Sequence, residues 1–188
     1  MPKDKHEWVR TQLDRIAEKL RDEHAMELAY SGMALGPDQW WCRSTHRAGV
    51  PYIAHIPYPQ QLDRWNQSAQ ADWVTLVGMA AGEQVYGDLA DAADSDRRRL
   101  ATALLHKRND GMLAGVPAKG LPPSDAVVAV WIPSKRDGGT YSAVQKAWRR
   151  RLPVILLNPD GETVTVPSRD RLGELLGKTN QPALGGVR

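Results

Sequence analysis

The sequence has one cysteine, Cys42, and no phenylalanine among its 188 residues. A single cysteine excludes an internal disulfide and a zinc site built from cysteines. No apolar run approaches the ~18 residues that a membrane-spanning helix needs. The charged start, residues 1–7, lacks the apolar segment of a signal peptide. These absences favour a cytoplasmic protein with no membrane partner, and nothing in the sequence calls for a metal or another cofactor.

The remaining composition is that of an ordinary globular domain. Hydrophobic residues make up 41% of the chain, and 188 residues are enough for one domain with a core. The net charge of +3 does not by itself indicate nucleic-acid binding. We interpret Cys42 as a packed core thiol rather than a nucleophile. The absence of Phe beside many Trp, Arg, Ala and Gly residues is typical of a GC-rich genome, such as an actinobacterium or one of its phages.

Alternating apolar patterns predict an α/β chain. The helical period predicts helices over residues 7–24, 38–48, 67–81, 94–113, 140–151 and 169–177. Short apolar runs predict strands over residues 27–31, 51–57, 83–86, 126–132 and 153–157, with an edge strand over 163–166. This alternation is typical of a Rossmann-like three-layer sandwich with a mostly parallel sheet. We expect one such domain over residues 1–167, followed by a short helix and a flexible tail over 168–188.

Two glycine-containing loops each join a predicted strand to a predicted helix. The first runs from Ser31 to Asp38 and the second from Asp137 to Thr140. Glycines let backbone N–H groups approach an anion at the positive end of a helix. The two loops therefore predict a pocket for a nucleotide-like ligand. Asp38 and Thr140 have a second interpretation, as helix caps.

The order of several motifs resembles that of a known superfamily. These motifs are SGMALGPDQWW, GVPYIAHIPYP, RWNQSAQADW, KRND, SDAVVAVW and GGT, and the resemblance that they carry covers roughly residues 8–160. They resemble the DprA/Lonely Guy (SLOG) superfamily, closest to its small stand-alone, often phage-borne proteins. The resemblance implies a cleft at the carboxyl ends of the strands, with the two loops facing each other. The ligand-binding candidates that it implies are Ser31, Gly32, Met33, Ala34, Leu35, Gly36, Asp38, Arg108, Asn109, Gly138, Gly139, Thr140 and Ser142.

The chain departs from the superfamily pattern in two ways. Relatives begin with a strand ahead of the first helix, whereas this chain starts in that helix. We therefore expect one strand to be missing, or to be supplied by a partner or by residues 163–166, and an uncovered sheet edge favours a homo-oligomer. The second departure is Ala143, which stands where the Lonely Guy phosphoribohydrolases carry a Glu. The absence of this Glu argues against hydrolysis, which needs a carboxylate.

The leading hypothesis is non-catalytic binding of a nucleotide or nucleotide-derived small molecule. One alternative is DprA-like binding of single-stranded DNA, for which the candidate contacts are Arg97, Arg98, Arg99, Arg149, Arg150 and Arg151. These arginines have a second interpretation, as solvated helix faces. The other alternative is a Lonely Guy-like hydrolase of nucleoside monophosphates. His55 is interpreted as a hydrogen-bonded interior histidine or as a site residue, and Trp40, Trp41 and Trp65 as core residues or as residues bordering the cleft.

Overall fold

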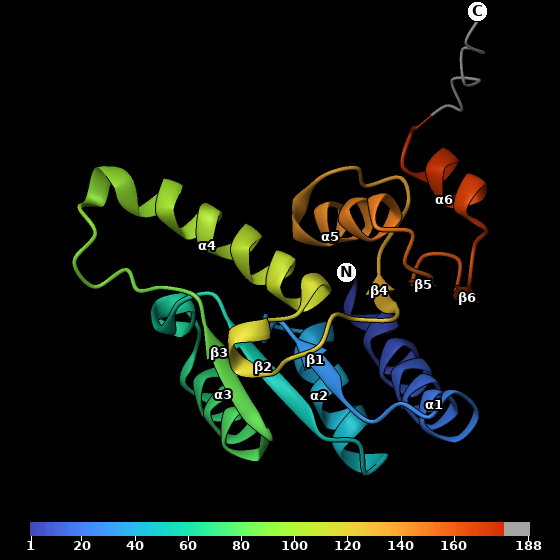
Figure 1. The fold of residues 1–188 in the computed structure, drawn as a ribbon, viewed down its shortest axis with the longest axis horizontal. Coiled ribbons are helices and arrows are strands. Elements are labelled where there is room, and N and C mark those ends of the chain that lie inside the picture. The colour runs from blue at the N-terminus through green and yellow to red at the C-terminus, as the bar shows by residue number, and fades with distance from the viewer. Residues whose placement is uncertain (179–188) are drawn as a thin grey trace, which may run out of the picture. The chain divides into compact units, whose positions relative to one another are not determined.

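The computed structural model describes residues 1–178 (Figure 1). The chain divides into two compact units, residues 1–124 and residues 125–188, which are described separately below. The division falls in the segment between α4 and β4, so the domain end predicted after residue 167 lies inside the second unit. Nearly all of the tail predicted after residue 177 lies outside the described residues.

The first unit contains a three-stranded parallel sheet. Its strands β1 (Ala29–Ser31), β2 (Tyr52–Ile56) and β3 (Gly82–Val85) lie in the order β1-β2-β3. All five β2 residues are buried, as expected of the central strand. The helices of this unit are α1 (His6–His24), α2 (Pro37–Arg47), α3 (Gln67–Met79) and α4 (Asp94–Ala114), and its short 3₁₀ turns span Lys3–Lys5, Pro59–Leu62 and Pro117–Lys119.

Helices α1 and α2 pack against each other through apolar and polar contacts. The buried face of α1 includes Leu13 and Ala17, and Ala17 belongs to the same core cluster as Cys42 of α2. At the edge of this interface, Asp14 accepts hydrogen bonds from the Ser44 hydroxyl at 2.6 Å and from the Arg47 guanidinium. Full burial of a leucine side chain contributes about 1.5–3 kcal/mol, so the apolar face stabilises the pair more than the exposed ion pair does.

The second unit has its own three-stranded sheet, in the order β4-β5-β6. Strands β4 (Val127–Val130) and β5 (Val154–Asn158) are parallel, and β6 (Thr163–Thr165) runs antiparallel to β5. Helix α5 (Gly138–Arg149) connects β4 to β5, and α6 (Arg169–Leu175) follows β6. The apolar β4, expected as a central strand, is only partly buried and lies at one end of this sheet.

The predicted fold class is confirmed. Strands alternate with helices, and three of the four strand pairings are parallel, as in a Rossmann-like α/β protein. The predicted edge strand near residue 163 is present, and it pairs with β5. Within residues 1–178, no helix is both long enough and apolar enough to cross a membrane.

Candidate functional site

The candidate site of the first unit lies where its three strands end. Ser31, Ile56 and Val85 are the last residues of β1, β2 and β3. Because the strands are parallel, these ends lie at one edge of the sheet, which is where open α/β sheets bind ligands. The segments leaving this edge are the predicted first loop, the Pro57–Tyr58 turn and the segment beginning at Tyr86.

The first loop folds on itself through its own polar groups. The Ser31 hydroxyl donates to the carbonyl of Asp38 at 2.9 Å and accepts from the N–H of Met33 at 3.3 Å. The Asp38 carboxylate accepts from the N–H of Ala34 at 3.2 Å. Two of the backbone donors predicted to hold an anion, those of Met33 and Ala34, therefore already have protein acceptors.

The interpretation of Asp38 as the cap of its helix is wrong. The N-cap of α2 is Gly36, with φ +91°, and Pro37 is the first helical residue, a position that proline favours. Asp38 lies inside the first turn, and its carboxylate turns back to the loop. Met33 is buried in the core, and its sulfur lies 3.5 Å from that of Cys42. Its backbone adopts φ +59°, an uncommon conformation for a residue with a side chain.

Arg108 of α4 reaches this loop from far along the chain. Its Nη1 donates to the carbonyl of Gly32 and lies 3.5 Å from the Asp38 carboxylate. Only 6% of Arg108 is exposed, and its Nε has no hydrogen-bond partner within residues 1–178. Burial lowers the pKa of Arg108, while Asp38 opposes that shift. The result is a buried cation with one long ion pair and one unused donor.

Gly32 is required for this approach. A Cβ at Gly32 would overlap the Arg108 guanidinium and crowd the Asp38 carboxylate. The motif glycine therefore makes room for a side chain of the protein, as well as shaping the turn. Asn109, the neighbouring candidate, is also buried, at 5% exposure.

A pair formed by His55 and the half-buried Tyr86 lies in the same part of the unit. His55 is fully buried on β2, and its Nδ1 lies 2.7 Å from the Tyr86 hydroxyl. Its Nε2 lacks a partner among the described residues. Burial, together with the positive charge of Arg108, lowers the pKa of His55 to about 4, so the ring is neutral near pH 7. The ring of Tyr30 lies edge-on to His55, with ring centres 4.7 Å apart.

Tyr86 and Gly111 also shape this site, and neither was a candidate from the sequence. Burial raises the pKa of Tyr86 to about 12, and nearby Arg108 opposes the shift. A Cβ at Gly111, in the last turn of α4, would overlap the Tyr86 hydroxyl. A glycine inside a helix costs about 1 kcal/mol relative to alanine, so its presence three residues after Arg108 was an available signal of close packing.

The tryptophans of this unit pack against protein groups. Trp41 and Trp65 pack against the core cluster. Trp40 lies beside α1, with the His6 ring 4.9 Å away and the Arg10 guanidinium 4.6 Å from its own ring centre. These contacts favour packing over the interpretation that Trp40 borders a cleft.

The second glycine segment belongs to the second unit. Helix α5 begins at Gly138, which has φ +80°, and its N-cap is Asp137. Thr140 is the third helical residue, so the interpretation of Thr140 as a helix cap is wrong. Gly139 and Thr140 are exposed, and Ser142 is half-buried. The structure describes the two units separately, so the meeting of this segment with the first loop stays a prediction.

The two arginine clusters lie near opposite ends of their helices, Arg97–Arg99 near the start of α4 and Arg149–Arg151 at the end of α5. Arg99 forms an ion pair of 3.1 Å with Asp96 on its own helix, and Arg97 lies 4.0 Å from Asp94. Arg98 is exposed. The run from Arg149 to Arg151 ends α5 and is exposed. Positive charges stabilise the C-terminal end of a helix, because they interact favourably with its dipole.

No cluster of three or more metal-ligating side chains occurs in residues 1–178. The polar groups brought together in the first unit are those of Gly32, Ala34, Asp38 and Arg108, with the His55–Tyr86 pair near the guanidinium. No family model and no curated protein matches this chain. The resemblance to the SLOG superfamily therefore stays an expectation from the motifs.

Proposed function

We propose that the first unit binds a nucleotide or nucleotide-derived small molecule at the carboxyl edge of β1, β2 and β3, without catalysis. The observation that carries the proposal is Arg108. A buried guanidinium is costly unless its charge is paired and its donors are used. Arg108 has one carboxylate at 3.5 Å and an unpartnered Nε. An anionic group of a ligand beside the guanidinium offsets this incompletely paired charge.

The surroundings of Arg108 favour an anion attached to an aromatic ring. Tyr86 and Tyr58 lie close enough to oppose the lowering of the Arg108 pKa. Neutral His55 offers an unpartnered ring nitrogen. A phosphate near Arg108 and a base or sugar near these rings account for both the cation and the polar aromatic groups. The competing interpretation is a structural arginine that only ties α4 to the first loop.

The first experiment measures the thermal shift of the purified protein with AMP, ATP, NAD and cyclic AMP at fixed, near-physiological salt. A ligand present at 100 times its Kd stabilises a protein by about 2.7 kcal/mol, which is a shift of about 5–10 °C for a chain of this size. Arg108→Lys keeps the charge but loses the guanidinium geometry, and we expect it to remove most of the shift. Arg98→Lys, on an exposed position of the same helix, is the matched control.

Three outcomes assign the alternatives. Release of free base from a nucleoside monophosphate, lost in Arg108→Lys, would favour the hydrolase. Salt-sensitive binding of a single-stranded oligonucleotide without any nucleotide shift would favour the DNA-binding alternative. A nucleotide shift of equal size in the wild-type protein and in Arg108→Lys would leave Arg108 a structural residue and overturn the proposal.

A further inference from the structure

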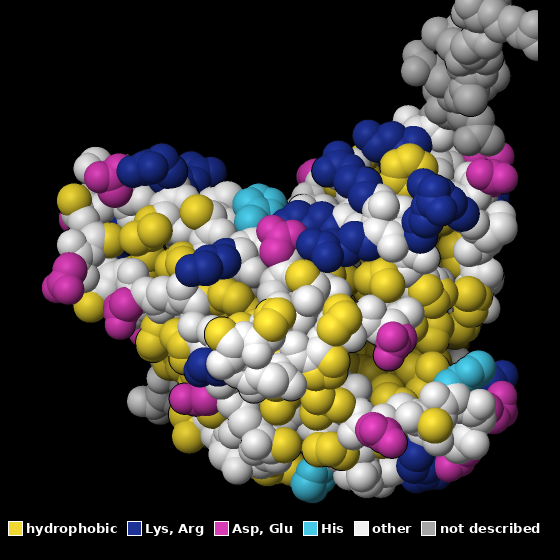
Figure 2. Space-filling view, viewed as in Figure 1, with side chains coloured by type: hydrophobic (Ala, Val, Ile, Leu, Met, Phe, Trp, Pro, Cys, Tyr) yellow, Lys and Arg dark blue, Asp and Glu magenta, His cyan; other side chains and the backbone are white. Residues whose placement is uncertain are grey.

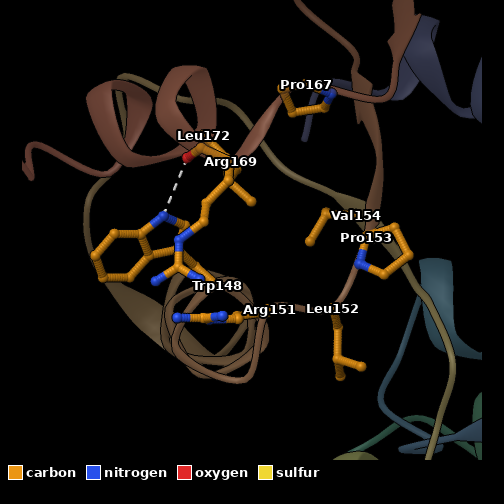
Figure 3. A pocket seen from close by; sticks show the side chains of 8 residues that line it. All are labelled: Trp148, Arg151, Leu152, Pro153, Val154, Pro167, Arg169 and Leu172. Atoms are coloured by element: carbon orange, nitrogen blue, oxygen red, sulfur yellow. Dashed lines mark hydrogen bonds between the residues drawn. The ribbon is translucent and has the colours of Figure 1, made fainter.

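A cavity of about 220 Å³ opens on the second unit, between the end of α5, the start of β5 and the start of α6 (Figure 3). Every residue that lines it belongs to this unit. One side is aliphatic and includes Leu152, Val154 and Pro167, while Trp148 and two arginines lie on the other side. The volume is below the ~300–1,000 Å³ of most small-molecule sites. The cavity therefore accommodates one or two side chains rather than a whole nucleotide.

Two cations lie at this cavity without carboxylate partners. Arg151 and Arg169 both line it. Neither guanidinium forms an ion pair within the described part of the chain, whereas the neighbouring Arg171 pairs with Glu174 at 2.7 Å. Lys and Arg side chains gather over α5 and α6 in the space-filling view (Figure 2). The charge of this surface is complementary to an acidic partner.

Trp148 is already occupied by protein groups. The Arg169 guanidinium lies over its ring, 5.3 Å from the ring centre, and its Nε1–H donates to the Arg169 carbonyl at 3.1 Å. A nucleobase would have to compete for a ring face with this cation. The aliphatic side of the cavity offers no other ring on which to stack. The cavity therefore favours an aliphatic group beside an anion over a base.

Arg151 adopts a backbone conformation that usually belongs to glycine. It has φ +63°, and it follows α5 at the position where a glycine commonly ends a helix. The N–H of Leu152 donates to the carbonyl of Ala147 at 3.0 Å, and that of Arg151 to Trp148 at 3.1 Å, which is the Schellman pattern. A residue with a side chain is strained here. The chain nevertheless carries a long cation at this position, and that cation lines the cavity.

We propose that this cavity binds a peptide segment of a partner protein in which an aspartate or glutamate adjoins a branched aliphatic residue. The carboxylate pairs with Arg151 and Arg169, because a guanidinium offers two parallel donors to a carboxylate. The aliphatic side chain enters beside Leu152 and Val154. The proposal concerns only the second unit and is independent of the nucleotide site.

The test titrates the full chain with a synthetic peptide, Gly-Glu-Leu-Asp-Leu-Gly, and follows the Trp148 indole N–H by NMR. Trp148→Phe identifies that signal among the seven tryptophans. We expect a saturable shift of this signal. Replacing the acidic residues of the peptide by their amides should weaken binding about tenfold, and replacing its leucines by serine should also weaken it.

Arg151→Gly is the decisive variant. It relieves the strained backbone, so the Tm should be unchanged or higher, while peptide binding should weaken about tenfold. Arg150→Ala removes an adjacent exposed charge outside the cavity and is the matched control, with an expected change of less than about twofold. Arg169→Gln, at the first position of α6, is a second variant that should weaken binding to a similar degree.

Two results would overturn the proposal. One is the absence of a saturable Trp148 response at peptide concentrations of several millimolar, or binding that both Arg151→Gly and Arg169→Gln leave unchanged. The other is a single-stranded oligonucleotide that binds more tightly than the peptide and loses its affinity in the same variants. That second result would assign the cavity to nucleic acid.

Discussion

The guanidinium of Arg108 lies against the backbone carbonyl of Gly32, 76 residues earlier in the chain. This contact links the C-terminal half of α4 to the loop that follows β1. It exists because position 32 has no side chain, since a Cβ there would occupy the place of the guanidinium. The contact holds the first loop and α4 together at the carboxyl edge of the sheet.

Gly32→Ala should destabilise the first unit by about 2 kcal/mol. The added methyl group displaces the guanidinium, and a hydrogen bond to a charged group contributes about 1.5–3 kcal/mol. The free energy of unfolding from urea denaturation measures the loss. In an Arg108→Ala background the same substitution should cost at least about 1 kcal/mol less, because the group that it meets is gone. Additive losses in this double-mutant cycle would contradict the contact.

Replacing each of two glycines in the last turns of helices by alanine should change the stability with opposite signs. Gly78 of α3 has open space around its Cβ position, so Gly78→Ala should stabilise the protein by about 0.5–1 kcal/mol. Gly111→Ala should instead destabilise it by about 1–3 kcal/mol, because the methyl group overlaps the Tyr86 hydroxyl. Urea denaturation of the two variants in parallel measures both effects. An increase in stability for Gly111→Ala would mean that Tyr86 does not pack on α4.

The stability of the first unit should fall as the pH falls through the range of His55. Its pKa is about 4 in the folded protein, against 6.5 for an exposed histidine side chain. As the pH falls, the unfolded chain therefore binds the proton first. The contribution of neutral His55 to the stability is fully present above about pH 6.5 and is lost as the pH falls towards 4. The slope is about 1.4 kcal/mol per pH unit, or about 3 kcal/mol over the window.

Urea denaturation between pH 5 and pH 8 measures this slope. His55→Asn is the control, because it removes the titrating ring and keeps a polar amide group near the position of Nδ1. We expect that variant to have a flatter profile over the same range. An equal slope in both proteins would place the titration on another group.

Cys42 should be unreactive in the folded protein. The thiol is buried, and burial raises its pKa to about 12, so almost no thiolate exists near pH 8. Ellman's reagent should modify Cys42 at least about 100-fold more slowly than it modifies the chain unfolded in guanidinium chloride. Comparable rates in the two states would contradict the packing of Cys42 against Met33.

Much of the secondary structure was predictable from the sequence. The periodic apolar positions of residues 7–24 place α1 within a residue of its bounds, and the glycine after α2, Gly49, has φ +73°. The start of α2 was less predictable, because Asp38 is as suitable a cap as Gly36 by residue type alone. Pro37 and the acceptor role of the Asp38 carboxylate towards Ala34 decided the start.

The sequence by itself determined the alternation of strands and helices and the glycine-containing turns, because hydrophobic periodicity and glycine act within a few residues. The resemblance of its motifs to those of a known superfamily also named an arginine and a loop as candidates for one site. Only the tertiary structure decided which donors remain available. It pairs Met33 with Ser31 and Ala34 with Asp38, and it leaves Nε of Arg108 and Nε2 of His55 without partners among the described residues. Hydrogen bonds between distant segments depend on how the elements pack, and no local pattern in the sequence encodes that packing.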